Sequence, residues 1–238
     1  MNTNKNIFSD ISSDIGFLQL SDSFFPTGMY TTSNGLETLF YKKKVTGKKT
    51  LYEFLKTSLT SQIGPADLVA LSNAYINAEK KDINNIIEID TYLFSLKIIK
   101  EIRDASVRSG KQMLRCLNEF ILDNKILHDY YNAITNKNTP GCFPISLAVG
   151  CNALGIKREK ACIILLYGFS VSVIGAALRL GMIQHIEGQQ IIHQIKPIFL
   201  DILENNIDRS TTNMWQFSPG IDLIQIEHEK MDSKMFIT

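Results

Sequence analysis

The chain has 238 residues, of which 45% are hydrophobic and 21% charged, and its 25 basic and 24 acidic side chains leave a net charge of +1. Non-specific binding to nucleic acid needs a surplus of Lys and Arg, so this near-neutral balance excludes nucleic acid as a partner. The apolar fraction excludes a wholly disordered chain and suffices for the core of one large or two small domains.

The cysteines and the first residues indicate the compartment. Cys116, Cys142, Cys151 and Cys162 are spaced by 26, 9 and 11 residues, which fits neither a zinc framework nor a disulfide scaffold. The N-terminus lacks the basic and apolar regions of a secretory signal. We therefore expect a reduced, cytoplasmic protein.

Residues 1–32 read as a loop-like N-terminal segment, with a short apolar patch followed by the breakers Pro26 and Gly28. A first helix is predicted to begin near Ser33. The five lysines within residues 42–49 then predict a solvated connection, because no glycine-rich phosphate cradle accompanies them.

Apolar residues recur at intervals of three and four along most of residues 33–208, which predicts an all-α fold despite 32 isoleucines. Thr50 and Glu53 predict a capping box, and Gly64-Pro65 predicts the end of that helix and the start of another. Asp82 is expected to cap the next helix. A long helix is expected from about Tyr92 to Leu122, in which Gly110 marks a close contact or a bend.

The second half of this domain begins with a helix that starts at Pro144 and ends near Gly155. Residues 161–178 follow without a charge, long enough for either a membrane span or a central core helix. The amphipathic neighbouring segments favour the core helix. Its small residues Gly168, Ser172 and Gly175 share one face, which we expect to contribute to an interface.

An amphipathic helix over about residues 187–205 is expected to bend at Pro197. The character changes at residues 209–238, which contain the sole tryptophan, Trp215, and apolar residues without a helical stripe. Such a tail either packs over its own domain or becomes ordered on a partner, and the pattern leaves both open. We thus expect a single-domain helical bundle with flexible N- and C-terminal segments.

Catalytic and metal-binding motifs are not apparent. The sequence has no phosphate-binding loop, dinucleotide fingerprint, nucleophile elbow or HExxH pair, and His128, His185, His193 and His228 are scattered. We expect neither enzymatic activity nor a firmly bound metal or other cofactor.

Several motifs in chain order resemble the UreF family of urease accessory proteins. These are LQLSDSFFPTG at residues 18–28, SNGLE at 33–37, EIRDAS at 101–106 with Gly110, NALGI at 152–156, AALRL at 176–180, and the tail positions Pro219, Asp222, His228, Glu229 and Phe236. Together they span nearly the whole chain.

The resemblance implies a non-catalytic, all-α and usually dimeric adaptor. Its partners would be a UreD-type scaffold protein, a UreG-type GTPase and, through their complex, apo-urease, into which the complex loads nickel. Regulation of the GTPase is the alternative role that it leaves open. The residues implied in partner binding or in supporting contacts are Pro26, Gly28, Tyr30, Gly35, Glu37, Arg103, Arg179, Trp215, Pro219, His228, Glu229, Lys234 and Phe236.

The sequence departs from the family pattern at four places. Met29-Tyr30 stands where a glycine and an aromatic are usual, Asn34 replaces a histidine, and Lys234 replaces an arginine. At the fourth place, Ile183-Gln184-His185 stands where Gly-Gln-Thr is usual. Lysine keeps the charge of arginine but loses its bidentate fork. These departures bear on partner affinity more than on the fold.

Overall fold

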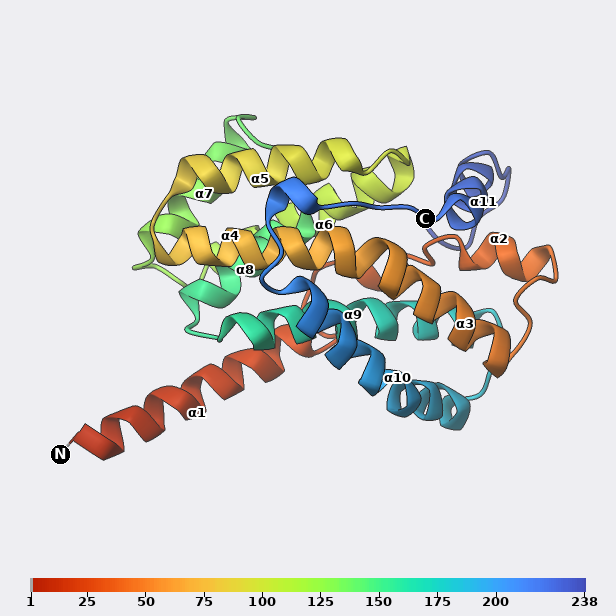
Figure 1. Cartoon of the computed structure of the whole chain (residues 1–238), viewed down its shortest axis with the longest axis horizontal. Coiled ribbons are helices and arrows are strands. Elements are labelled where there is room, and N and C mark those ends of the chain that lie inside the picture. The colour runs from red at the N-terminus through yellow and green to blue at the C-terminus, as the bar shows by residue number, and fades with distance from the viewer. Residues whose placement is uncertain (1) are drawn as a thin grey trace.

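The computed structural model describes residues 2–238, except the side chains of residues 2–9 and of Tyr30. These residues form helices and contain no β-strand, which confirms the all-α prediction (Figure 1). In chain order the elements are α1 (Asn2–Ser21), η1 (Met29–Thr31), α2 (Leu36–Tyr41), α3 (Lys48–Ser58), η2 (Leu59–Leu68), α4 (Val69–Glu79), α5 (Ile83–Leu96), α6 (Lys100–Asn118), α7 (Lys125–Thr135), α8 (Phe143–Ala153), α9 (Arg158–Arg179), α10 (His185–Asn206), η3 (Thr211–Asn213) and α11 (Pro219–Glu229).

Helices α4, α8 and α9 form the centre of the bundle. Helix α8 packs against α4, α6 and α9, and nine of its residues are buried. Close helix contacts depend on glycine here: a Cβ at Gly110 of α6 would lie 2.2 Å from the carbonyl oxygen of Gly141. Gly110 therefore marks a close approach, one of the two predicted alternatives, and Pro144 lies in the first turn of α8 as expected.

The uncharged segment lies within α9. It is the one helix of the described residues long and apolar enough to cross a membrane, but 67% of its most apolar window is buried inside the bundle. It packs against α1, η1, α2, α4, α8 and α10. A largely apolar helix needs such coverage by its neighbours, so the structure supports the core-helix interpretation.

The prediction of a loop-like start is wrong, because residues 2–21 form α1. Ser13, Gly16, Phe17 and Leu20 recur at helical spacing and face the body: the Ser13 hydroxyl donates to the Gly155 carbonyl at 2.9 Å, and Leu20 is buried. The side of α1 turned away from the body holds further apolar residues. Because apolar residues lie on both sides of α1, they form no single stripe, and the sequence pattern did not predict this helix.

The predicted break at Gly64-Pro65 is also wrong. Helix α3 continues through the π-helix η2 into α4 without interruption. A π-helix has a wider backbone, and its irregular hydrogen bonding leaves carbonyl groups available to other donors. The backbone N–H groups of Trp215 and Phe217 donate to the carbonyls of Pro65 and Ser61, at 3.2 and 3.1 Å. Tail residues distant in sequence thus compensate for the proline.

Two predicted helix boundaries shift. Thr50 is the third residue of α3 rather than its cap, and its hydroxyl accepts from the backbone N–H of Gly47 at 3.3 Å. The long helix predicted from Tyr92 to Leu122 breaks between α5 and α6. At this break Lys97 turns inward, where its Nζ lies 2.8 Å from Oδ2 of buried Asp67. The predicted cap at Asp82 is confirmed.

The C-terminal tail packs over its own domain, which decides between the two alternatives that the sequence left open. Residues 209–238 run back across the bundle, form α11 beside α2 and end close to it (Figure 1). The tail residues Met214, Ile221, Ile224 and Phe236 are buried in the main core. The tail therefore contributes to the same hydrophobic core as the body.

Candidate functional site: a polar cluster that holds the tail

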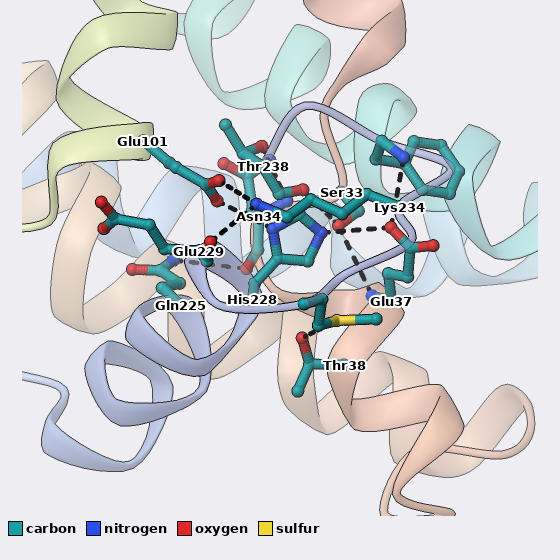
Figure 2. A network of polar contacts seen from close by, with 12 residues as sticks. Ser33, Asn34, Glu37, Thr38, Glu101, Gln225, His228, Glu229, Lys234 and Thr238 are labelled. Carbon is teal, nitrogen blue, oxygen red and sulfur yellow. Dashed lines mark hydrogen bonds and ion pairs between the residues drawn. The ribbon is translucent and has the colours of Figure 1, made fainter.

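The tail places the side chain of His228, on α11, between two carboxylates of the body. It is fully buried. Its Nε2 lies 3.1 Å from Oε2 of Glu37 on α2, and its Nδ1 lies 2.8 Å from Oε2 of Glu101 on α6. Figure 2 shows the imidazole between these two carboxylates. One histidine therefore joins three helices that are far apart in sequence.

The two contacts constrain the protons of the cluster. A neutral imidazole carries one N–H, so it donates one hydrogen bond only. Both contacts are hydrogen bonds when the ring carries two protons, or when one carboxyl group is protonated.

Glu37 also binds the tail backbone. Its Oε1 accepts from the N–H of Met235 at 2.8 Å, and its Oε2 accepts from the N–H of Phe236 at 3.1 Å. The side chain is fully buried. A buried carboxylate needs such donors to offset the loss of hydration, so these bonds specify where the tail end lies.

Lys234 adds the positive charge of the cluster. Its Nζ lies 2.5 Å from Oε1 of Glu101 and 3.0 Å from the backbone carbonyl of Glu229. Glu101 therefore binds His228 with one oxygen and Lys234 with the other (Figure 2). One lysine nitrogen makes the contacts with both Glu101 and the Glu229 carbonyl, although the family pattern has an arginine at this position.

Arg179 and Phe236 connect the tail to the end of α9. The guanidinium carbon of Arg179 lies 4.4 Å from the centre of the Phe236 ring, and its Nε donates to the Gly175 carbonyl at 3.0 Å. Phe236 is 3% exposed. This arrangement combines a cation–π contact with burial of the aromatic ring. We call Glu37, Glu101, Arg179, His228, Lys234 and Phe236 the tail latch.

The last residues pair with the segment before α2. The backbone N–H of Ser33 donates to the Thr238 carbonyl at 2.9 Å, and the Ser33 hydroxyl binds the same oxygen. The N–H of Ile237 donates to the Thr31 carbonyl at 2.9 Å. The residues that follow the N-terminal helix and the end of the tail therefore form one unit.

Gly35 allows this unit to pack. Its φ of +88° lies in the left-handed region, and a Cβ there would lie 3.1 Å from Cγ of Gln225 on α11. A side chain at this position would meet both backbone strain and crowding. Gly28, whose φ is +77°, precedes η1 and is exposed.

The other predicted site residues lie outside the latch. Arg103 sits over the Phe94 ring at 4.9 Å, Pro26 and Glu229 are exposed, and Pro219 is the first residue of α11. The exposed Trp215 is bound through its backbone to η2. The side chain of Tyr30 lies outside the described residues.

Sequence reasoning placed Glu101 and Ser33 in family motifs but assigned a role to neither. It also expected the small-residue face of α9 to contribute to an interface. The structure shows that Ser172 on this face is buried by the chain itself, and its hydroxyl contacts the Thr32 hydroxyl and the Met29 carbonyl. No local pattern indicates these pairings, because the partners are more than 100 residues apart.

The contacts of this site hold the tail against the body. Its carboxylates are engaged with tail donors, and among the described residues no three His, Cys, Asp or Glu side chains are grouped to hold a metal ion. The cysteines of the core are poor nucleophiles, because burial raises the pKa of Cys142 and Cys151 and raises that of Cys162 to about 12.

Comparison with known proteins agrees with the resemblance seen in the sequence motifs. The UreF family model matches residues 45–196. A urease accessory protein UreF from Trichodesmium erythraeum is 32% identical over 230 residues, covering 97% of this chain and 99% of that protein. UreF 1 of Brucella melitensis is 31% identical over 220 residues, covering 92% and 90%, and UreF of a Bacillus species is 26% identical over 225 residues, covering 94% and 98%.

Proposed function

This chain belongs to the UreF family of urease accessory proteins, and from that premise we propose that it serves urease maturation as a non-catalytic adaptor. It bridges a UreD-type scaffold protein and a UreG-type GTPase, and the complex inserts nickel into apo-urease. Nickel is the cargo of the complex and not a firmly bound cofactor of this chain.

The observation that carries the proposal is the apolar outer face of α1. Ile11, Ile15 and Leu18 follow one another at helical spacing and are 48%, 61% and 65% exposed. Helix α1 projects from the body, as Figure 1 shows. An exposed apolar stripe on a projecting helix is typical of a surface that docks into a groove of another protein.

The tail offers a second exposed apolar group. Trp215, Phe217 and Leu223 present large apolar side chains to solvent. The proposal assigns partner contact to these residues and to the exposed loop around Pro26 and Gly28. The buried His228 and Phe236 then act indirectly, because they hold the tail in the conformation that a partner meets.

The proposal also includes the cytoplasm as the compartment and a homodimer as the functional unit. The dimer is supported by the family membership together with the amount of exposed apolar surface. Sedimentation analysis of the purified full chain tests it directly. A single monomeric species at micromolar concentration would contradict the dimer without affecting the adaptor role.

The adaptor role is tested by capture of the cognate UreD-type scaffold on immobilised full-length protein. The double variant Ile15→Asp/Leu18→Asp places two charges on the outer face of α1 and is expected to lower capture at least tenfold. Leu122→Asp is the matched control, because Leu122 is similarly exposed but lies in the α6–α7 connection. Equal capture by the double variant and the control would contradict the docking role of α1.

Deletion of residues 209–238 is a poor test of the tail. It would remove Met214, Ile221, Ile224 and Phe236 from the core and expose the surface beneath them. The variant Phe217→Asp changes the tail surface and leaves these residues in place. We expect it to lower scaffold capture while the thermal unfolding temperature stays unchanged.

A further inference from the structure

A hollow of about 500 Å³ lies where the α2–α3 connection meets the beginning of α11. Its apolar lining consists of Leu39, Val45, Phe54 and Ile221. All four are nearly completely buried, so they form its floor. The tail latch shares α2 and α11 with this hollow but none of its lining residues.

Lysines stand at the rim of this hollow. Lys44 and Lys49 line it, and they belong to the run of five lysines in residues 42–49. The rest of the chain has 20 basic and 24 acidic side chains, so this run is the main concentration of positive charge in a nearly neutral protein. Its position beside an apolar floor is a property that the sequence alone did not reveal.

The fold does not neutralise these two lysines. Lys42 pairs with Glu227 of α11, and Lys48 donates to Oε1 of Gln190 on α10 at 2.6 Å. Among the described residues, no carboxylate lies within ion-pair distance of Lys44 or Lys49.

Glu53 is the one acidic residue among those that line the hollow, so the two lysines leave it net positive. The surface therefore combines two cations, Lys44 before α3 and Lys49 in its first turn, with an apolar floor.

We propose that this hollow docks an acidic segment of a protein partner. The apolar side chains of the segment cover Leu39, Val45, Phe54 and Ile221, and its carboxylates pair with Lys44 and Lys49. Charge complementarity selects the acidic segment and raises its association rate, and its apolar side chains cover the small apolar area that the floor still exposes. A polyanion without apolar side chains leaves that floor uncovered, which favours a protein segment over nucleic acid or a lipid surface.

The proposal goes beyond the adaptor role, since it concerns a surface separate from α1 and from the tail latch. It is tested with the full-length protein and a fluorescein-labelled, twelve-residue helical peptide that has glutamate on one face and leucine on the other. The matched probe carries glutamine in place of every glutamate. Fluorescence anisotropy measures the Kd of each peptide.

We expect the glutamate peptide to bind at least tenfold more tightly than the glutamine peptide, and its affinity to fall as salt screens the exposed charges. Lys44→Glu/Lys49→Glu should weaken the glutamate peptide about tenfold, the size expected for reversing two exposed charges. Lys80→Glu/Lys81→Glu is the matched control, because this exposed pair lies at the end of α4, and it should change the Kd less than twofold.

Several outcomes overturn the proposal. They are absence of binding by the glutamate peptide, equal binding of both peptides, and equal effects of the two double variants. Tighter binding of double-stranded DNA or of phosphatidylserine vesicles at the same ionic strength, lost in Lys44→Glu/Lys49→Glu, would assign the surface to a polyanion instead. Loss of scaffold capture by the α1 variants leaves this result unaffected, so the two proposals fail separately.

Discussion

The two ends of the chain differ in how they are attached. Helix α1 presents one side to the body and leaves a stripe of three apolar residues in solvent, whereas the tail buries Phe236 and His228 and binds the body through charged groups. Exposed ion pairs contribute little to the free energy of unfolding. Removing one partner of a buried, hydrogen-bonded charge lowers that free energy much more, because the other partner stays buried and unpaired. The outer face of α1 is therefore exposed without any change in the fold, while movement of the tail requires the latch to be broken.

The largest expected effect comes from removing the carboxylate that holds the tail end. Glu37→Ala leaves His228 and two backbone N–H groups buried without their acceptor. We expect a loss of about 3 kcal/mol in the free energy of unfolding, measured by urea denaturation. Glu229→Ala removes an exposed carboxylate from the same helix as His228 and should change stability by less than about 0.5 kcal/mol. Equal midpoints for the two variants would contradict the structural role of Glu37.

A smaller effect is expected at the end of the tail. Phe236→Ala removes the ring that packs beneath Arg179. We expect docking of the tail to weaken by about 2 kcal/mol, so that proteolysis within residues 230–238 becomes about 30-fold faster. The exposed neighbour Met235 supplies the control, and Met235→Ala should leave the cleavage rate near that of the unchanged chain.

The third prediction compares the buried and the exposed side of α1. Leu20 is buried against the body and Leu18 is exposed. Leu20→Ala should cost about 1.5 kcal/mol, the low end for a buried leucine. Leu18→Ala should change stability little, because alanine is at least as good a helix former as leucine. Thermal unfolding of both variants measures the difference, and equal unfolding temperatures would show that α1 does not dock on the body.

The smallest effect is expected for the ion pair between Asp14 and Lys160, both of which are partly exposed. Asp14→Asn should lower global stability by about 0.5 kcal/mol or less. Hydrogen exchange is the more sensitive measurement, and exchange in α1 should rise more than in α9. Asp10→Asn is the control, since Asp10 makes no ion pair among the described residues. A loss of several kcal/mol would mean that α1 is held as tightly as the tail.

Local patterns in the sequence determined much of the fold. Spacing of three and four predicted helices because that period matches the helical repeat, and it outweighed the preference of isoleucine for strands. Asp82 as a cap, Pro144 in a first turn and Gly110 at a close contact are properties of a few neighbouring residues, and they were predictable for that reason. The ordered motifs also indicated the family, because each motif is a short run of residues that can be recognised without knowing its neighbours in space.

The structure alone decided how distant segments meet. Glu37, His228 and Phe236 could be named from motifs. The contacts of His228 with Glu37 and Glu101, however, join residues separated by more than 100 positions. Tail N–H groups bind carbonyls of the π-helix through Gly64-Pro65, and one side of α1 packs on the body. The sequence by itself indicated the helical class of residues 33–208 and several of the caps, but it did not indicate α1, α11 or the break between α5 and α6. The pairing of those segments was decided by burial and hydrogen bonding across the fold, which no local period records.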